Sequence, residues 1–181
     1  MSVMCFQARA NISLISVGLN PIDLIWTNRP PYAKQPAFVH DLKYAGKEWG
    51  EKVLDLRQEL KALRMDAMVV TSLDEVAWLL NIRGRDTPYS PLVRAFLIVT
   101  PSEIHMYTNQ SKIPREVRLH LNTWSCHSEN CVRLHYYENI TEDLRTFSQG
   151  WSRVLIPSDY MYNQGASQAI YSAVFMRKLS I

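Results

Sequence analysis

The amino-acid sequence predicts an α/β domain in which a mixed sheet is flanked by helices. Apolar residues recur at three- and four-residue spacings over residues 47–63, which is the period of a helix buried on one face. A short apolar run at 66–72 and a second helical segment at 73–81 follow at once, and this alternation is typical of α/β domains. Two further apolar runs, 93–100 and 103–109, are separated by a Pro-Ser turn, which predicts an antiparallel hairpin.

The rest of the chain continues this alternation. Residues 113–122 predict a helix with a proline near its first turn, where proline is favoured. A strand is then expected at 131–137, a helix at 140–149 and the last clear strand at 153–159. The tail, residues 160–181, predicts a short helix and a strand.

The two ends of the chain differ from this domain. Residues 1–18 show no clear periodicity and are assigned as a leader. Residues 19–36 are rich in proline, which favours extended backbone and predicts a strap held by the indole of Trp26. The α/β domain is expected to span residues 37–176, and residues 177–181 are assigned as a truncated tail.

Composition excludes several classes of protein. Of the 181 residues, 47% are hydrophobic and 20% charged, which is ordinary for a globular domain with one core. The formal charge of +3 and the lack of any Lys/Arg run of five argue against a nucleic-acid partner. No stretch of eighteen apolar residues is present, so no membrane span is predicted.

The sequence contains conflicting indications of compartment. Asn109 and Asn139 begin Asn-X-Ser/Thr sequons in predicted turns, where glycosylation is expected in a secreted protein. Residues 1–18 have no basic region and no uninterrupted apolar run, so no signal peptide is recognisable.

Cys126 and Cys131 close a short polar loop, CHSENC. A four-residue spacer permits a disulfide if the backbone turns, which would suit an oxidising compartment. Two thiolates with His127 and His135 would be an alternative zinc site, although the spacing is not that of a standard zinc knuckle. Free thiols are the third possibility at this stage.

No pattern of catalytic residues stands out. The chain contains no HExxH, P-loop or GxSxG motif. Asp74 and Glu75 are adjacent on a predicted helix, where side chains diverge and acids in the first turn complement the helix dipole. We therefore predict no catalytic residue and no metal site in this chain.

The stretch AWLLNIRGRDTPYSPL predicts a stiff, charged loop directly after a buried helix. Gly84 is expected to end the helix in a left-handed conformation, with Asn81 and Arg83 in the last turn. The two prolines restrict the loop and lower the entropy cost of holding its shape. Arg83, Arg85 and Asp86 either face a partner or neutralise one another.

Several motifs together resemble the middle domain of the three-domain Xaa-Pro aminopeptidases, the aminopeptidase P family. They are DLIWTNRPP, W-x-x-K-V-x-x-L-R, TSLDEVAWLLNIRGRD and PYSP, in the family's order and spacing over nearly the whole chain. The resemblance implies a creatinase-type N-terminal domain with a ribonuclease-H-like fold. It also implies that Asn81, Arg83, Gly84 and Asp86 form a loop that faces the catalytic domain, at the substrate entrance or an interdomain contact.

The same resemblance implies an enzyme that removes the N-terminal residue from peptides with proline at position two. Its two divalent metals, manganese or zinc, are bound by a C-terminal pita-bread domain, for which this chain supplies no ligands. We therefore expect a non-catalytic domain whose partner is the missing catalytic domain. The alternative is a stand-alone module that binds a full-length homologue.

The segments TPYSP, YTNQSK, SCHSENC and DYMY resemble the secreted or membrane-anchored branch of this family. That branch implies a Cys126–Cys131 disulfide, a glycan on Asn109 and an extracellular or cell-surface location.

Overall fold

The computed structural model describes residues 20–124, 126, 129–157 and 166–175. The chain forms two compact units, Met1–Tyr32 and Ala33–Ile181.

The described part of the first unit contains a short helix, α2 (Pro21–Ile25), where the sequence predicted extended backbone. A proline begins this helix because the first helical position needs no backbone N–H donor. The side chain of Asn20 caps the helix by accepting a hydrogen bond from the Ile22 N–H at 3.0 Å. After the helix, the Arg29 guanidinium lies 5.5 Å from the centroid of the Trp26 ring.

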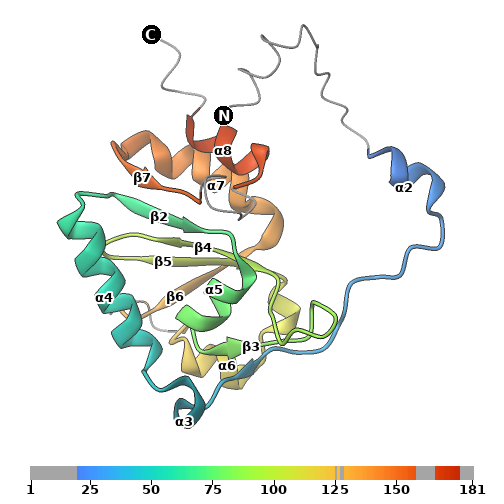
Figure 1. The fold of residues 1–181 in the computed structure, drawn as a ribbon, viewed down its shortest axis with the longest axis horizontal. Helices are drawn as coiled ribbons and strands as arrows, with labels where there is room; N and C mark the ends of the chain where they lie inside the picture. Colours follow the sequence, from blue (N-terminus) through green and yellow to red (C-terminus); the bar gives the residue numbers. More distant parts are fainter. Residues whose placement is uncertain (1–19, 125, 127–128, 158–165, 176–181) are drawn as a thin grey trace, which may run out of the picture. The chain divides into compact units, whose positions relative to one another are not determined.

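The second unit alternates helices and strands along the chain (Figure 1). Its described elements, with η denoting a 3-10 helix, are β1 (Phe38–Val39), α3 (Leu42–Ala45), α4 (Trp49–Ala62), β2 (Ala67–Val70), α5 (Leu73–Leu79), β3 (Ile82–Arg83), β4 (Ala95–Val99), β5 (Ile104–Thr108), η1 (Gln110–Lys112), α6 (Arg115–His120), β6 (Val132–Tyr136), η2 (Tyr137–Asn139), α7 (Ile140–Phe147), η3 (Ser148–Gly150), β7 (Val154–Leu155) and α8 (Gln168–Phe175).

Five strands form one mixed sheet in the order β6–β5–β4–β2–β7. Strand β4 pairs antiparallel with both β2 and β5, whereas β6 runs parallel to β5 and β7 runs parallel to β2. The β4–β5 pair is the hairpin that the Pro-Ser turn predicts. Strands β1 and β3 form a separate antiparallel ribbon, which the sequence did not predict.

Helices cover both faces of the five-stranded sheet, and each face has its own hydrophobic core (Figure 1). On one face, Leu60 of α4 and Val76 of α5 share a core with Leu97 of β4. On the other face, Leu144 of α7 shares a core with Ile98 of β4. Leu97 and Ile98 are neighbours in sequence, and successive residues of a strand point to opposite faces. The second unit therefore has three layers, and the predicted fold class is confirmed.

Most of the predicted elements are present, with adjusted ends. The predicted helix at 113–122 is shorter than expected, and Pro114 occupies its N-cap position, next to the first turn. In the C-terminal tail, α8 is the expected short helix, whereas residues 158–165 and 176–181 lie outside the described part of the chain. Within the described residues, no helix is both long enough and apolar enough to cross a bilayer.

Candidate functional site

The loop after α5 begins at Asn81, where the chain leaves the helix. Asn81 has a φ of +51°, the left-handed conformation that often ends helices and that asparagine tolerates better than most residues. Its carbonyl accepts a hydrogen bond from the His40 N–H at 2.8 Å. The left-handed residue was predicted to be Gly84, and that prediction is wrong: Gly84 has no positive φ and follows β3.

The side chain of Asn81 is 2% exposed and connects two other parts of the chain. Its Oδ1 accepts a hydrogen bond from Nζ of Lys52 at 2.7 Å, and its Nδ2 donates to the Lys47 carbonyl at 2.8 Å. Lys52 also donates to the Trp78 carbonyl at 2.9 Å and lies 4.5 Å from the centroid of the Trp78 ring. Burial, with the nearby charges of Arg83 and Lys47, lowers the pKa of Lys52. Lys52 is the lysine of the W-x-x-K motif, but no pattern in the sequence indicates that it fixes the loop.

Arg83 binds back onto the helix that precedes it. Its Nη1 donates to the carbonyl oxygens of Ala77 at 2.7 Å and Ile82 at 2.9 Å. Ala77 lies in the last turn of α5, so the guanidinium satisfies a carbonyl that the helix itself leaves unpaired. Burial lowers the pKa of Arg83. Neither of the two alternatives from the sequence describes this Nη1 group, which is bound to backbone carbonyls.

Gly84 lies where two segments of the loop approach each other closely. A Cβ atom at this position would lie 2.7 Å from Cγ2 of Val93 and 3.0 Å from the carbonyl oxygen of Leu92. The Gly84 N–H donates to the Pro91 carbonyl at 3.2 Å, which holds the two segments together. Glycine is needed here for this close approach and not for a left-handed backbone.

Asp86 is buried in an ion pair with Lys112 of η1. Its Oδ1 contacts Nζ of Lys112, and its Oδ2 accepts a hydrogen bond from the Arg94 N–H at 2.7 Å. The Asp86 and Lys112 side chains are 9% and 7% exposed, and burial lowers the pKa of Lys112. Neither alternative from the sequence holds for Asp86, because its carboxylate neither faces outward nor pairs with Arg83 or Arg85.

The tip of the loop is exposed and tightly turned. The Thr87 carbonyl accepts a hydrogen bond from the Ser90 N–H at 3.3 Å. Between them, Tyr89 has a φ of +62°, which glycine or asparagine usually adopts in such turns, and its side chain is fully exposed. Arg85 and Trp78 are exposed as well. We call these three residues, Trp78, Arg85 and Tyr89, the outer loop face.

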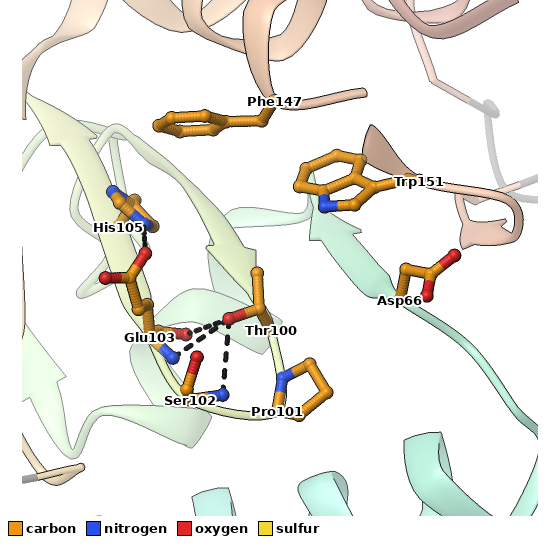
Figure 2. A pocket seen from close by; sticks show the side chains of 8 residues that line it. All are labelled: Asp66, Thr100, Pro101, Ser102, Glu103, His105, Phe147 and Trp151. Atoms are coloured by element: carbon orange, nitrogen blue, oxygen red, sulfur yellow. Dashed lines mark hydrogen bonds and ion pairs between the residues drawn. The ribbon is translucent and has the colours of Figure 1, made fainter. Parts of the chain in front are cut away.

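A hollow of about 390 Å³ opens beside the β4–β5 turn, on the sheet face that α7 covers (Figure 2). Phe147 and Trp151 form one side of it, and Glu103 and His105 form another. The charged and imidazole groups that line it have protein partners: His105 Nε2 lies 3.1 Å from Glu103 Oε2, and the Asp66 carboxylate accepts the Ser152 N–H at 2.6 Å. The hollow is therefore a weaker candidate for a ligand site than the loop.

The predicted disulfide is present. Cys126 and Cys131 are bonded, with their Cα atoms 5.0 Å apart, so the alternatives of a zinc site and free thiols are wrong. His127 lies outside the described residues. The two sequon asparagines, Asn109 and Asn139, are both exposed.

Metal ligands are not clustered in the described part of the chain. No group of three or more His, Cys, Asp or Glu side chains is arranged there to hold a metal ion. The described residues therefore do not fit the two divalent metals that the resemblance implies for a complete enzyme.

The chain is similar to proteins of one family. The family model of the Creatinase/Prolidase N-terminal domain matches residues 28–180. Xaa-Pro aminopeptidase 2 of Sus scrofa is 32% identical over 173 residues, which are 94% of this chain and 25% of that protein. A probable Xaa-Pro aminopeptidase P of Paracoccidioides brasiliensis is 38% identical over 142 residues, 78% of this chain and 22% of the relative.

A solved structure is also similar. It is the crystal structure of an X-prolyl aminopeptidase from Caenorhabditis elegans, described as a cytosolic enzyme with a di-nuclear active site. The TM-score is 0.73 at 34% identity, and the match covers 80% of this chain and 23% of that one. The chain thus spans a quarter or less of the length of these relatives.

Proposed function

Because this chain belongs to the creatinase/prolidase N-terminal domain family, we propose that it acts as the non-catalytic middle domain of a proline-specific metalloaminopeptidase. Such an enzyme removes the N-terminal residue from peptides with proline at position two. Its two divalent metals, manganese or zinc, belong to a catalytic domain, in keeping with the lack of a ligand cluster among the described residues.

The observation that carries this proposal is the construction of the loop between α5 and β4. Its inner side is anchored by Asn81 and by the buried Asp86–Lys112 pair, whereas its outer face is exposed. Exposed aromatic and arginine side chains are typical anchors of protein interfaces. A surface that is already ordered loses little conformational entropy when it binds. The outer loop face therefore contacts the catalytic domain, and Asn81, Arg83, Gly84 and Asp86 position it.

A first experiment tests whether the chain is non-catalytic. The purified 181-residue chain is incubated with the peptide Arg-Pro-Pro and Mn²⁺, beside the C. elegans enzyme as positive control. We expect no release of arginine by the chain. Metal-dependent release that follows the amount of chain added would contradict the proposal.

A second experiment tests the outer loop face in an active enzyme. Residues 28–180 replace the matching segment of the C. elegans enzyme, and hydrolysis of Arg-Pro-Pro is measured. We expect the chimaera to be active and the double variant Arg85→Ala, Tyr89→Ala to lower kcat/KM about tenfold, which corresponds to about 1.4 kcal/mol. Tyr136→Ala, which removes an exposed tyrosine from β6, is the matched control and should have little effect. Equal activity of all variants would exclude this contact.

The alternative is a stand-alone module that binds an intact aminopeptidase through the same face. The exposed Tyr89 and Trp78 favour it, because a free interaction surface would present such side chains. Mixing the chain with the intact C. elegans enzyme separates the two cases. The middle-domain proposal predicts no complex, because that enzyme already contains a matching segment. A stable complex that Tyr89→Ala abolishes would favour the alternative.

We also propose an extracellular or cell-surface location for the parent protein. The Cys126–Cys131 disulfide supports this, because disulfides persist in oxidising compartments. The C. elegans relative is described as cytosolic and gives this part of the proposal no support. Expression through a secretory pathway should yield a chain whose mobility shifts on enzymatic deglycosylation. Asn109→Gln and Asn139→Gln should each remove part of that shift, and a chain without glycans would contradict the proposal.

A further inference from the structure

Two histidines on neighbouring strands face each other on the α7 side of the sheet. His105 belongs to β5 and His135 to the parallel strand β6. Nδ1 of His105 lies 3.0 Å from Nε2 of His135, and the ring centroids are 5.1 Å apart. His105 is almost fully buried, whereas a quarter of the His135 side chain is exposed, at 26%. Such a short distance is a hydrogen bond, which needs a proton on one of the two nitrogens and a lone pair on the other.

Each ring also contacts a carboxylate through its other nitrogen. Glu103 Oε2 lies 3.1 Å from His105 Nε2, and Asp143 Oδ2 lies 3.3 Å from His135 Nδ1. The hydroxyl of Tyr107 donates to the same Asp143 oxygen at 2.9 Å. Because Asp143 belongs to α7, this chain of contacts runs from the β4–β5 turn across two strands to the helix.

The number of protons decides whether these contacts are satisfied. The three contacts, Glu103 to His105, His105 to His135 and His135 to Asp143, need three N–H donors on the four ring nitrogens. One neutral ring and one cationic ring supply them. Two neutral rings supply only two donors, so one of the three contacts is left without a proton. Two cationic rings place two N–H groups against each other, and the His105–His135 bond is then lost.

We propose that His105, His135, Glu103 and Asp143 form a proton-controlled latch between the sheet and α7. The latch is closed while the His105–His135 bond is kept, which requires that at most one of the two rings is cationic, and it opens when acid protonates both. The inference does not depend on the proposed function, because every contact lies within this domain. Protons reach the pair from solvent, since His105 lines the open hollow (Figure 2).

Other charged groups around the pair are few in the described part of the chain. Arg133 of β6 pairs with Glu103 at 3.0 Å, and Asp66 lines the same hollow as His105. Arg133 opposes protonation of both rings. One imidazolium balances the charges, because with Arg133 it offsets the two carboxylates of the latch. A second imidazolium leaves an excess positive charge.

The direction of the acid effect follows from the pKa values. Burial lowers the pKa of both histidines, and Glu103 and Asp143 only partly oppose this. In an unfolded chain, histidine side chains titrate at about pH 6.5. The unfolded state therefore binds more protons than the folded state as the pH falls below that value. Stability that is present at neutral pH is lost as the pH falls through the lowered pKa values of the folded state.

The test measures proton binding by His105 and opening of α7 in the 181-residue chain. His135→Gln keeps a hydrogen-bonding group near the position of Nε2 but cannot become cationic. We expect imidazole NMR to show that His105 binds its proton about tenfold more tightly in His135→Gln, which is one pKa unit. His40→Gln removes a histidine outside the latch and should leave the His105 titration unchanged. An unchanged His105 titration in His135→Gln would overturn the proposal.

Amide hydrogen exchange gives the second measurement. Exchange of the α7 amides is measured at pH 7 and pH 5 and corrected for the intrinsic exchange rates. From pH 7 to pH 5, the protection factors of these amides should fall about tenfold further in the wild-type chain than in His135→Gln. This is the difference expected when opening is coupled to the binding of one proton. Equal losses in the two chains would overturn the link to α7. If His135→Gln does not fold, the wild-type titration decides alone: two coupled steps support the latch, and two independent steps at the ordinary pKa overturn it.

Discussion

The two faces of the sheet contain two polar networks of different chemistry. On the α4–α5 side, the loop network (Lys52, Asn81, Asp86 and Lys112) is built from amide, carboxylate and ammonium groups. On the α7 side, the latch is built around two imidazoles, the side chains that titrate closest to neutral pH. The surface proposed to contact a catalytic domain is thus anchored without any imidazole. The opposite side contains the groups that respond to acid.

The largest expected effect is the loss of the buried Asp86–Lys112 pair. Asp86→Ala leaves the Lys112 ammonium buried without its carboxylate, and breaking a buried pair in this way typically costs about 3–5 kcal/mol. Urea unfolding at pH 7 measures the change. The neighbouring Arg85→Ala is the control, because an exposed substitution changes stability by about 0.5 kcal/mol or less.

The double variant Asp86→Leu, Lys112→Met sharpens this test. Apolar residues of similar volume often replace a buried ion pair with little loss, so part of the stability should return, although the Arg94 N–H lacks its Asp86 acceptor in both variants. If the double variant is as unstable as Asp86→Ala, the loop depends on the ionic contact itself. The difference between a loop network fixed by an ion pair and a latch built on two imidazoles is then larger. If Asp86→Ala costs no more than Arg85→Ala, the loop is not anchored by this pair.

Asn81→Ala should have the next largest effect. It removes the acceptor of the Lys52 ammonium, and hydrogen bonds to charged groups contribute about 1.5–3 kcal/mol. Alanine is also strained at a φ of +51°, whereas glycine is not. Urea unfolding of Asn81→Ala and Asn81→Gly separates the two causes. We expect the glycine variant to be the more stable by about 1 kcal/mol; the reverse order would mean that the backbone conformation is unimportant.

The sequence predicts those structural elements whose physical cause leaves a pattern in the sequence. Hydrophobic periodicity located the long helix α4 and the β4–β5 hairpin, because burial of one face leaves a repeat in the sequence. The ribbon of β1 and β3 was missed because two-residue strands are too short to show any period. The helix α2 was missed because the whole proline-rich stretch 19–36 was assigned as an extended strap, although proline is favoured at the first helical position.

The sequence predicted a stiff, charged loop after α5 as the candidate site, but it did not reveal the buried partners of the loop residues. Asp86 pairs with Lys112, which lies twenty-six positions further along the chain, and no local pattern reveals such a partner. The helix end was placed at Gly84 because glycine is the commonest left-handed residue, whereas asparagine serves at Asn81. The same limit applies to the latch, since the contact of His105 with His135 depends on the pairing of β5 with β6.

Gly84→Ala is expected to have a smaller effect on the loop. The new methyl group would meet Val93 and the Leu92 carbonyl, and overpacking of this kind typically costs about 1–3 kcal/mol. Adding Val93→Ala should recover part of the loss in urea unfolding, because it removes the closer of the two contacts. Gly150→Ala is the matched control, since nothing lies within 4 Å of the added atom. Equal costs at the two glycines would show that the close approach is not maintained in solution.

Tyr107→Phe should have the smallest effect and tests the other side of the comparison. The hydroxyl donates to Asp143, and hydrogen bonds to charged groups contribute about 1.5–3 kcal/mol. The cost should lie at the low end of this range, because the Asp143 side chain is 27% exposed and keeps His135 as a partner. Burial and Asp143 raise the pKa of Tyr107, so the hydroxyl remains a donor throughout the range of the test. Without it, the Asp143 carboxylate interacts more strongly with a cationic His135, which partly compensates for the lost bond. The cost of Tyr107→Phe in urea unfolding should therefore be lower at pH 5 than at pH 7.

Tyr136→Phe, at an exposed tyrosine, should cost little at either pH. A cost at Tyr107 that does not change with pH would mean that Asp143 is not coupled to the imidazole pair, and the contrast between the two networks would then rest on His105 and His135 alone.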